Sequence, residues 1–351
     1  MTQWQWITQE RNGAQIADVG VALTNRRMTF QLNRPSVLGA SLRAEDVRAN
    51  RGSTGGLKPG VHELMVYRDG SPQETVFQLT KADVSADANA IGLSFEWQGV
   101  SSYLQDALIY PQAAAYSSTT LAWDWIETFQ ARTGGSYGLT EGTNTGTPPT
   151  RQKTIQQEAE LLATVQQVAE SGAGFDFAIN TSRQWVEWHT ERGSDNGLVL
   201  EYGVNVSTFS YTEDTGPGQI TNAIFVIGPP GSQVVTATDT DSRTTYGRRE
   251  AAASFFADFE DSTVTTGQLQ AHADKIIAER PNPIIIPQLS LVTTHQSLSW
   301  GSYWLGDTVT FRARVGNYDT INAAYRIVQI DVALDDNDNE TISLGLNEVR
   351  S

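Results

Sequence analysis

The side chains that most often bind metal ions or act as general bases are few in this sequence and far apart. Its four histidines are His62, His189, His272 and His295, and no two of them have the i, i+4 spacing of a zinc-binding helix. An isolated histidine is usually structural, and the chain has no cysteine that could complete a metal site. We therefore expect no catalytic residue, no metal site and no cofactor site, and we do not expect an enzyme.

The stretch DDNDNE, residues 335–340, gathers carboxylates that could bind calcium. A calcium-binding helical hand needs a D-x-[DN]-x-[DN]-G loop between two helices, and this stretch has no glycine. Hydrophobic residues alternate at 328–334 before it and at 342–346 after it, which predicts two strands with one buried face. Asp and Asn favour the tight turn between such strands. A hairpin tip is the favoured interpretation, and a structural or adventitious calcium ion is the alternative.

Other motifs for catalysis are weak. The sequence has no G-x-S-x-G elbow, and GSTGGLKPG at 52–60 lacks the GK[ST] ending of a phosphate-binding loop, so we expect a flexible loop or a subunit contact there. Two carboxylates could still hydrolyse a glycoside, but their separation in space, not along the chain, decides this.

Two pairs of tryptophans could stack on sugars: Trp185 with Trp188, and Trp300 with Trp304. Aromatic residues that fill a core are more common than exposed platforms. Trp185 and Trp188 are three positions apart, so on a regular strand they face opposite sides, and we expect one of them to be exposed.

The charge disfavours a surface that neutralises nucleic-acid phosphates. The chain has 24 Lys and Arg against 40 Asp and Glu, a formal charge of −16. The excess is uneven: residues 1–110 hold 10 bases and 11 acids, whereas 201–351 hold 9 bases and 19 acids. The absence of cysteine fits a protein made in a reducing cytosol. We expect neither a secretion signal nor a membrane-spanning segment, because no apolar run approaches about 20 residues.

Short strands are predicted from residue 28 to about 97. Hydrophobic residues recur at every second position from Ile91 to Trp97, so they share one face of a strand. Asp-Gly-Ser-Pro at 69–72 supplies a turn between two earlier strands. These strands predict a small antiparallel sheet or barrel.

The hydrophobic period then becomes helical. This period predicts two helices. The buried face of the first comprises Val100, Tyr103, Leu104 and Leu108, and that of the second comprises Leu121, Trp125 and Phe129. Ser117–Thr120 are candidate caps of the second helix, and Gly134 and Gly135 end it. The Gly-, Thr- and Pro-rich segment 134–150 is predicted to be a long exposed loop.

The clearest local prediction is a helix of about four to five turns from Thr154 to Gly172. Thr154 lies three residues before Gln157, the spacing of a capping box. After it, FDFAI and QWVEWH flank the turn NTSR as a hairpin. Together these elements predict an α/β insert over residues 116–197.

Strand-like segments return from residue 198. One more helix is marked by Leu269, Ala273 and Ile276, and Pro281 and Pro283 prevent its continuation. Strands then continue almost to the end, which predicts a second sheet.

Four segments, taken together, resemble one protein family. They are YRDG at 67–70, LEYGVNVSTFSYTED at 200–214, YGRRE at 246–250, and WLGDTVTF at 304–311 followed by YRIVQIDVALDD. Their order and spacing are similar to those of the tail-tip or baseplate hub proteins of tailed bacteriophages, the minor tail proteins of the siphophage tail-associated hub family. Each segment is a strand and turn pattern, not a catalytic signature, and the resemblance spans most of the chain.

The resemblance implies a mainly β fold with an α+β insert, made of two tail-tube-like β-barrel domains and a small α/β domain. With the predicted elements, this gives an N-terminal barrel at 1–115, the α/β insert at 116–197 and a second barrel at 198–351 with one inserted helix at about 265–280.

The resemblance also implies a structural virion protein at the distal tip of the tail, made in the host cytoplasm. Three copies with two barrels each would form a homotrimer of six similar units, which adapts the sixfold tail tube to threefold tip proteins. The implied partners are the distal tail protein ring and the tail tube, the C-terminus of the tape-measure protein, and tail fibre or receptor-binding proteins. DNA would cross the lumen during ejection without specific binding.

Two alternatives remain. The first is a tail module that binds cell-surface carbohydrate through loops such as 134–150 and through Trp185 and Trp188. The second, which is less favoured, is a carboxylate glycosidase.

Overall fold

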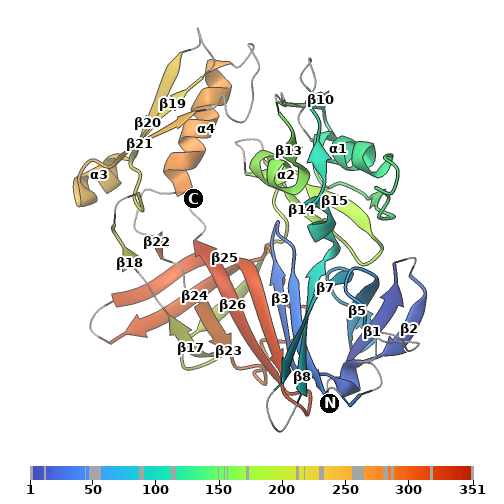
Figure 1. Ribbon diagram of the computed structural model, residues 1–351. Helices are drawn as coiled ribbons and strands as arrows, with labels where there is room; N and C mark the ends of the chain where they lie inside the picture. Colours follow the sequence, from blue (N-terminus) through green and yellow to red (C-terminus); the bar gives the residue numbers. More distant parts are fainter. Residues whose placement is uncertain are drawn as a thin grey trace.

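A computed structural model describes residues 3–11, 13–43, 45–46, 57–86, 91–111, 116–148, 150–153, 155, 157–170, 174–210, 213–216, 218–228, 233–254, 265–279, 284–285, 288–316 and 319–348. Figure 1 shows one large sheet and two smaller units that mix helix and strand, both on the same side of that sheet. The prediction of a mainly β protein with an α/β insert is confirmed.

The first part of the chain supplies half of the large sheet. Its strands are β1 (Trp4–Glu10), β2 (Gln15–Asp18), β3 (Thr24–Gln31), β4 (Val37–Arg43), β5 (His62–Arg68), β6 (Ser71–Pro72), β7 (Phe77–Ala86) and β8 (Ile91–Gly99). β5 and β6 enclose the predicted turn at Asp69 and Gly70, both of which have positive φ. Alternation places Phe95 and Trp97 of β8 in the core, as the period of two predicts, while Ile91 is exposed at the strand's start.

The last part of the chain supplies the other half. Its strands are β16 (Asp195–Glu201), β17 (Val206–Ser210), β23 (Gln288–Leu291), β24 (Thr308–Val315), β25 (Asp319–Leu334) and β26 (Glu340–Glu348). β25 and β26 form the hairpin predicted around residues 335–340.

The two halves join edge to edge into one sheet of 14 strands, in which eight consecutive strands run in the order β17-β23-β26-β25-β3-β4-β8-β7. The seam is the antiparallel pair β25 and β3, with Ile330 opposite Phe30 and Val332 opposite Met28. The first half of β25 pairs with β24 instead, and the register of its pairing with β26 shifts between Ile327 and Gln329. β25 therefore pairs with β24 along its first half and with β3 along its second half.

The α/β insert comprises η3 (Val100–Leu104), β9 (Leu108–Ile109), β10 (Tyr116–Ser118), α1 (Leu121–Gln130), β11 (Thr140–Glu141), β12 (Arg151–Lys153), β13 (Ala159–Glu160), α2 (Leu161–Ala169), β14 (Asp176–Ile179) and β15 (Gln184–Trp188). The predicted helix α1 and the hairpin of β14 and β15 are present. α1 ends at Gln130, before Gly134.

Three local predictions in this insert are wrong. The helix expected from Thr154 begins only at Leu161, because Ala159 and Glu160 pair with β9 and the Leu161 N–H donates to the Ala107 carbonyl. Thr154 itself lies outside the described residues. The face expected from Val100 to Leu108 is a short 3-10 helix followed by strand β9, and Leu108 is exposed.

The third concerns segment 134–150, which is not a free loop along its length. β11 pairs in parallel with β15, and Thr145 forms a bridge with Trp188. Leu139 is buried, and Gln130 bonds both the N–H and the carbonyl of Leu139. This segment therefore adds a third strand to the hairpin.

A second α/β unit lies within the C-terminal part. It comprises β18 (Glu213–Asp214), β19 (Ala223–Ile227), β20 (Val234–Thr238), α3 (Thr240–Tyr246), β21 (Glu250–Ser254), α4 (Thr266–Glu279) and β22 (Ile284–Ile285). α4 is the helix predicted at about 265–280, and it covers the sheet β20-β19-β21. The short pair β18 and β22 carries the chain into this unit and back.

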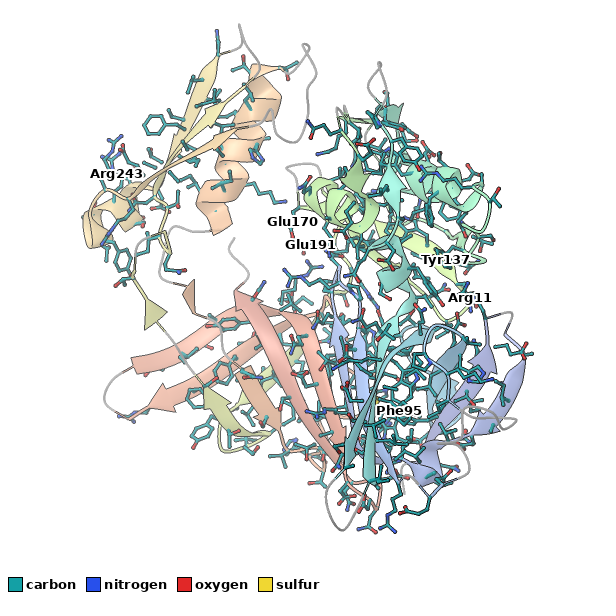
Figure 2. The ribbon with its side chains drawn as sticks, in the orientation of Figure 1. Arg11, Phe95, Tyr137, Glu170, Glu191 and Arg243 are labelled. Carbon is teal, nitrogen blue, oxygen red and sulfur yellow. The ribbon has the colours of Figure 1, made fainter. Side chains whose placement is uncertain are left out.

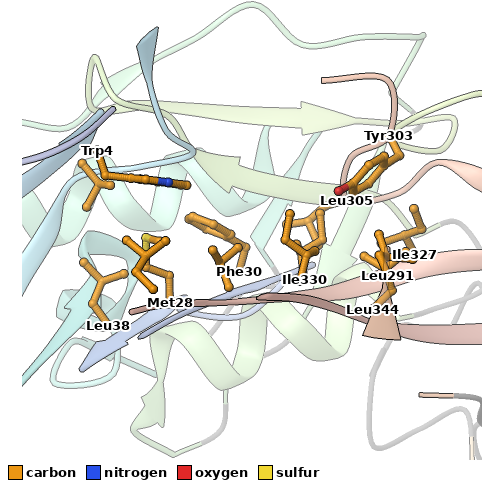
Figure 3. Packing of buried hydrophobic residues seen from close by; sticks show 14 of the residues in the cluster. Trp4, Met28, Phe30, Leu38, Leu291, Tyr303, Leu305, Ile327, Ile330 and Leu344 are labelled. Carbon is orange, nitrogen blue, oxygen red and sulfur yellow. The ribbon is translucent and has the colours of Figure 1, made fainter. Parts of the chain in front are cut away.

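Three hydrophobic cores correspond to these parts. The largest runs without interruption from Trp4 and Met28 of the first half to Ile330 and Leu344 of the second, as Figure 3 shows. The α/β insert and the α4 unit each have a core of their own. The domain division at 1–115, 116–197 and 198–351 stays a prediction, with the added finding that the large sheet and its core cross the first and last of these segments.

Candidate interaction surfaces

One face of the large sheet packs on the hydrophobic core, and the opposite face is polar and continuous. On the central strands, hydrophobic residues point into the core and small polar residues alternate with them. We call this surface the polar sheet face; its residues include Thr29, Gln31, Gly39, Ser41, Ser94, Glu96, Gln329, Asp331, Thr341, Ser343 and Gly345. It crosses the seam, so both halves of the chain contribute to it.

Side-chain hydrogen bonds order this face at the seam. Thr29 Oγ1 donates to Asp331 Oδ1 at 2.6 Å, and Gln329 Nε2 donates to Asp331 Oδ2 at 2.8 Å. Gly345 faces Gln329, and a Cβ at this glycine would come within 3.0 Å of Gln329 Cβ. A side chain at position 345 would crowd Gln329, so the glycine leaves room for Gln329 beside the seam.

The polar sheet face carries little net charge. Arg27, Lys81, Asp83, Glu96 and Asp331 lie on it, and Lys81 pairs with Asp83 at 2.6 Å. A hollow of about 390 Å³ over β3, β4, β8 and β7 is lined by part of this set. Tight phosphate binding needs several unpaired Lys or Arg side chains, whereas the charged residues named on this face are two basic and three acidic ones.

Polar contacts hold the α/β insert against both halves of the sheet. Asp176 of β14 accepts from Asn33 at 2.9 Å and forms an ion pair with Arg326 of β25. Arg192 forms a bidentate pair with Glu74 at 2.8 and 2.9 Å. Three parts of the chain that are distant in sequence therefore meet at one point.

A second junction surrounds Glu63, which is fully buried on β5. Arg183, from the turn of the β14 and β15 hairpin, forms an ion pair with it, and Tyr103 Oη donates to it at 2.9 Å. Burial raises the pKa of Glu63, while Arg183 and Tyr103 act against that rise. Burial and the neighbouring Glu63 raise the pKa of Tyr103.

The four histidines lie in different elements and do not come together. His62 Nδ1 accepts from the Lys58 N–H, and His295 Nδ1 lies 2.8 Å from Ser297 Oγ. His272 is on α4. Among the described residues, no group of three or more His, Asp or Glu side chains has the geometry of a metal site.

His189 lies in a buried polar group of the insert, 3.4 Å from Glu187. Burial raises the pKa of Glu187, and burial together with Arg151 lowers the pKa of His189. Trp185 Nε1 donates to Glu187 at 2.9 Å. These residues orient the hairpin of the insert.

The acidic stretch 335–340 is the tip of the β25 and β26 hairpin. Asp335 accepts from the backbone N–H groups of Asn337 and Asn339 and from the Asn339 side chain. These bonds lower the pKa of Asp335. Arg26 pairs with Asp338 at 2.7 Å, so the hairpin interpretation accounts for these carboxylates.

Of the tryptophans proposed as sugar platforms, one is buried and three are half-buried against other side chains. Trp185 is fully buried, and Trp188, on the opposite side of the strand, is half-buried with Arg192 over its ring at 4.8 Å. Trp300 packs edge-on against Trp4 and Trp304. The prediction that the two tryptophans of β15 face opposite sides is confirmed, but the exposed face expected for one of them is covered by arginine.

A groove of about 980 Å³ separates the two α/β units above the seam, and residues from α2, β14, α4 and β25 line it. Lys275 of α4 bridges it, because its Nζ donates to the Glu170 carbonyl at 2.7 Å. Of GSTGGLKPG, residues 52–56 lie outside the described part of the chain. No helix of the described residues is long and apolar enough to cross a bilayer.

Sequence reasoning missed the polar sheet face. Its signal is present as Ser, Thr, Gln and Gly at alternate positions of β3, β4 and β26, between the hydrophobic positions that reveal the strands.

Solved structures with a similar fold include tail proteins. The tail protein from Neisseria meningitidis MC58 superimposes with a TM-score of 0.68 and 11% identity, over 98% of this chain and 96% of that one. The 43 kDa tail protein of prophage MuSo2 from Shewanella oneidensis gives 0.65 and 14%, over 98% of both chains.

A third solved structure is an E. coli component of the type VI secretion system, described as structurally similar to the T4 bacteriophage tail proteins gp27 and gp5. It gives a TM-score of 0.54 and 9% identity, over 94% of this chain and 74% of that one. No family model and no curated protein matches the chain. The chain therefore has the fold of phage tail proteins, and the resemblance seen in the sequence is confirmed at the level of the fold.

Proposed function

We propose that this protein is a structural component of a phage tail, the hub at its distal tip. Three copies would form a ring around a channel. Each copy contributes the two halves of its large sheet, so the ring contains six similar half-sheets. The observation that carries the proposal is the seam between β25 and β3, which joins the two halves in one layer of eight strands. The fold shared with tail proteins supports it.

In this ring the polar sheet face lines the channel. Its side chains, which together carry little net charge, fit a wall past which DNA moves without being held. The sixfold tail tube, the distal tail protein ring and the tape-measure C-terminus would lie along the axis, and fibre or receptor-binding proteins would attach outside. The carbohydrate-binding alternative loses support, because Trp185 is buried and the other three tryptophans are half-buried, with Arg192 over Trp188 and with Trp300 packed against Trp304.

Native mass spectrometry of the purified full-length chain tests the ring. We expect a complex of three copies. Electron microscopy of this complex should show threefold symmetry, with six similar half-sheets around an open axis. Detection of the chain at the tail tip in purified particles is the second expected result. A protein that stays monomeric at high concentration and is absent from particles would contradict the proposal.

A further inference from the structure

One flank of the molecule carries arginines stacked on aromatic rings. Arg132 lies 4.0 Å from the ring centre of Tyr110 and 5.5 Å from that of Phe129. The stack continues through Tyr137 and Tyr103, whose rings are 4.1 Å apart and nearly parallel, to Arg11. We call this surface the arginine–aromatic flank; its members are Arg11, Tyr103, Tyr110, Phe129, Arg132 and Tyr137.

The flank is rigid. Arg132 Nη1 donates to the Leu108 carbonyl at 2.8 Å, and Arg11 Nη2 donates to the Gly60 carbonyl at 3.2 Å. Arg183 donates to the carbonyl oxygens of Tyr137 and Arg11, which ties these two members of the flank to the same guanidinium. Side chains fixed in this way lose little further entropy when a partner binds.

The flank is also accessible and has unused donors. Tyr110 is 52% exposed and Leu108 is 42% exposed. Within the described residues, neither Arg11 nor Arg132 forms an ion pair with a carboxylate. Tyr and Arg are enriched at the energetic centres of protein interfaces, and a planar guanidinium binds carboxylates in a bidentate manner.

The chemistry favours a protein carboxylate over a sugar or a nucleic-acid base. Sugars and bases stack on free ring faces, and here Tyr103 and Tyr137 stack on each other while Arg132 covers Tyr110. The chain's net charge of −16 also disfavours nucleic acid. The flank therefore fits an acidic segment that brings apolar side chains with it.

Such a segment exists on the opposite flank of the same chain. The turn between β16 and β17 carries Glu201, which is exposed, with Tyr202 and Val204, which are 47% and 50% exposed. Asn205 fixes this turn, because its Oδ1 accepts from the Glu201 N–H at 2.7 Å and its Nδ2 donates to the Val199 carbonyl at 2.9 Å. The part of the sequence that contains this turn, residues 201–351, has 19 acids and 9 bases, although the cross-strand neighbour of Glu201 is Arg312 of β24.

The two surfaces lie on opposite sides of the molecule. Figure 2 shows Arg11 and Tyr137 on one side, and Figure 1, in the same orientation, shows β17 on the other. They cannot meet within one chain. Complementary surfaces on opposite flanks join copies head to tail, and such contacts close into a ring when the rotation allows it.

We propose that the arginine–aromatic flank of one copy binds the β16 and β17 turn of the next, with Glu201 against Arg132. Tyr202 and Val204 then cover Leu108 and Tyr110. This inference rests on the proposed ring, but it names the surfaces that close it, and the ring could exist without this contact.

A charge exchange between the two surfaces tests the contact. Arg132→Glu and Glu201→Arg are each expected to raise the concentration at which the trimer dissociates by at least about tenfold, because each places like charges together. The double variant Arg132→Glu with Glu201→Arg should return to within about threefold of the wild type. Mass photometry of full-length proteins over a dilution series measures this, and circular dichroism confirms that each variant is folded.

The matched control is Arg43→Glu, which reverses another exposed arginine and should leave dissociation unchanged. A wild-type protein that is monomeric at every concentration overturns the proposed ring itself. A stable wild-type trimer that survives both single exchanges overturns only this contact. Single exchanges that dissociate the trimer without rescue in the double variant also overturn it, since the two surfaces then do not face each other.

Discussion

At the scale of single residues, Glu63 shows how the insert is attached. Its carboxylate is buried among Arg183, Tyr103 and Gln9, which come from three separate elements. Arg183 reaches it from a turn position with φ of 60°, a conformation that residues other than glycine seldom adopt. The ion pair is buried, and such pairs often fix one arrangement of parts more than they stabilise the fold.

Replacing Glu63 with Gln is expected to change the pH dependence of stability. Because the pKa of Glu63 is raised in the folded protein, its contribution is complete below the pKa of the unfolded chain and is lost as pH rises through the folded value. The unfolding free energy of the wild type should therefore fall relative to that of Glu63→Gln as pH rises above the pKa of a glutamic acid in the unfolded chain, by about 1.4 kcal/mol for each pKa unit of the shift. Urea denaturation at several pH values measures this difference.

The control for this change is Glu127→Gln, an exposed position on α1, whose pH profile should follow the wild type. Parallel profiles for Glu63→Gln and the wild type would show that the carboxyl titrates alike in the folded and unfolded chains.

At the scale of elements, strand β25 determines whether the sheet is one piece. Ile330 is fully buried at the seam, opposite Phe30 of β3, and the core around it includes side chains from both halves. The two halves therefore share one hydrophobic interior.

Ile330→Ala is expected to lower the unfolding free energy by about 3 kcal/mol, since it removes buried methyl groups and leaves a cavity. The loss should shift a single transition that reports on both halves, followed by near-ultraviolet circular dichroism and by tryptophan fluorescence. Ala333→Ser, at an exposed position of the same strand, should change stability by less than about 0.5 kcal/mol. Two separate transitions, of which only one moves, would mean that the seam does not couple the halves.

The sequence predicted elements well where periodicity alone decides them. The alternation at 328–334 and the helical spacing of Leu121, Trp125 and Phe129 both describe one buried face, and both elements form. The capping-box spacing at Thr154 failed, because pairing of Ala159 and Glu160 with β9 competes with helix over the same residues. That pairing is non-local, and no local pattern contains it.

At the scale of the whole molecule, the edge-joined sheet follows from contacts between the two ends of the chain. Thr29 and Asp331, which bond at the seam, are 302 positions apart. The sequence predicted two β regions and an insert between them, but neither the seam nor the second α/β unit around α4. Each depends on which strand edges meet, and alternation within a strand does not specify its neighbours.

Cations placed on the polar sheet face should slow the passage of DNA without preventing assembly. The double variant Ser94→Lys with Thr341→Lys adds two exposed positive charges on either side of the seam. Phosphate contacts strengthen binding sharply, so we expect DNA release from assembled particles to slow severalfold, more at low salt than at high salt. Release is measured by the fluorescence of a DNA-binding dye after triggering.

Thr128→Lys with Thr236→Lys is the matched control, because these exposed positions lie on the two α/β units and not on the polar sheet face. Unchanged release in both double variants would show that this face is not the wall of the channel.

The position of β3 early in the chain has a consequence for synthesis. This strand leaves the ribosome long before β25, so one of its edges waits unpaired while about three hundred further residues are translated. An unpaired edge invites pairing with other nascent chains, and charged side chains discourage it. Arg26 and Arg27 lie on β3. In the folded protein Arg26 binds the tip of the β25 and β26 hairpin, which is synthesised late. We expect the same arginine to disfavour aggregation of the nascent chain, and in the folded protein it holds the hairpin tip.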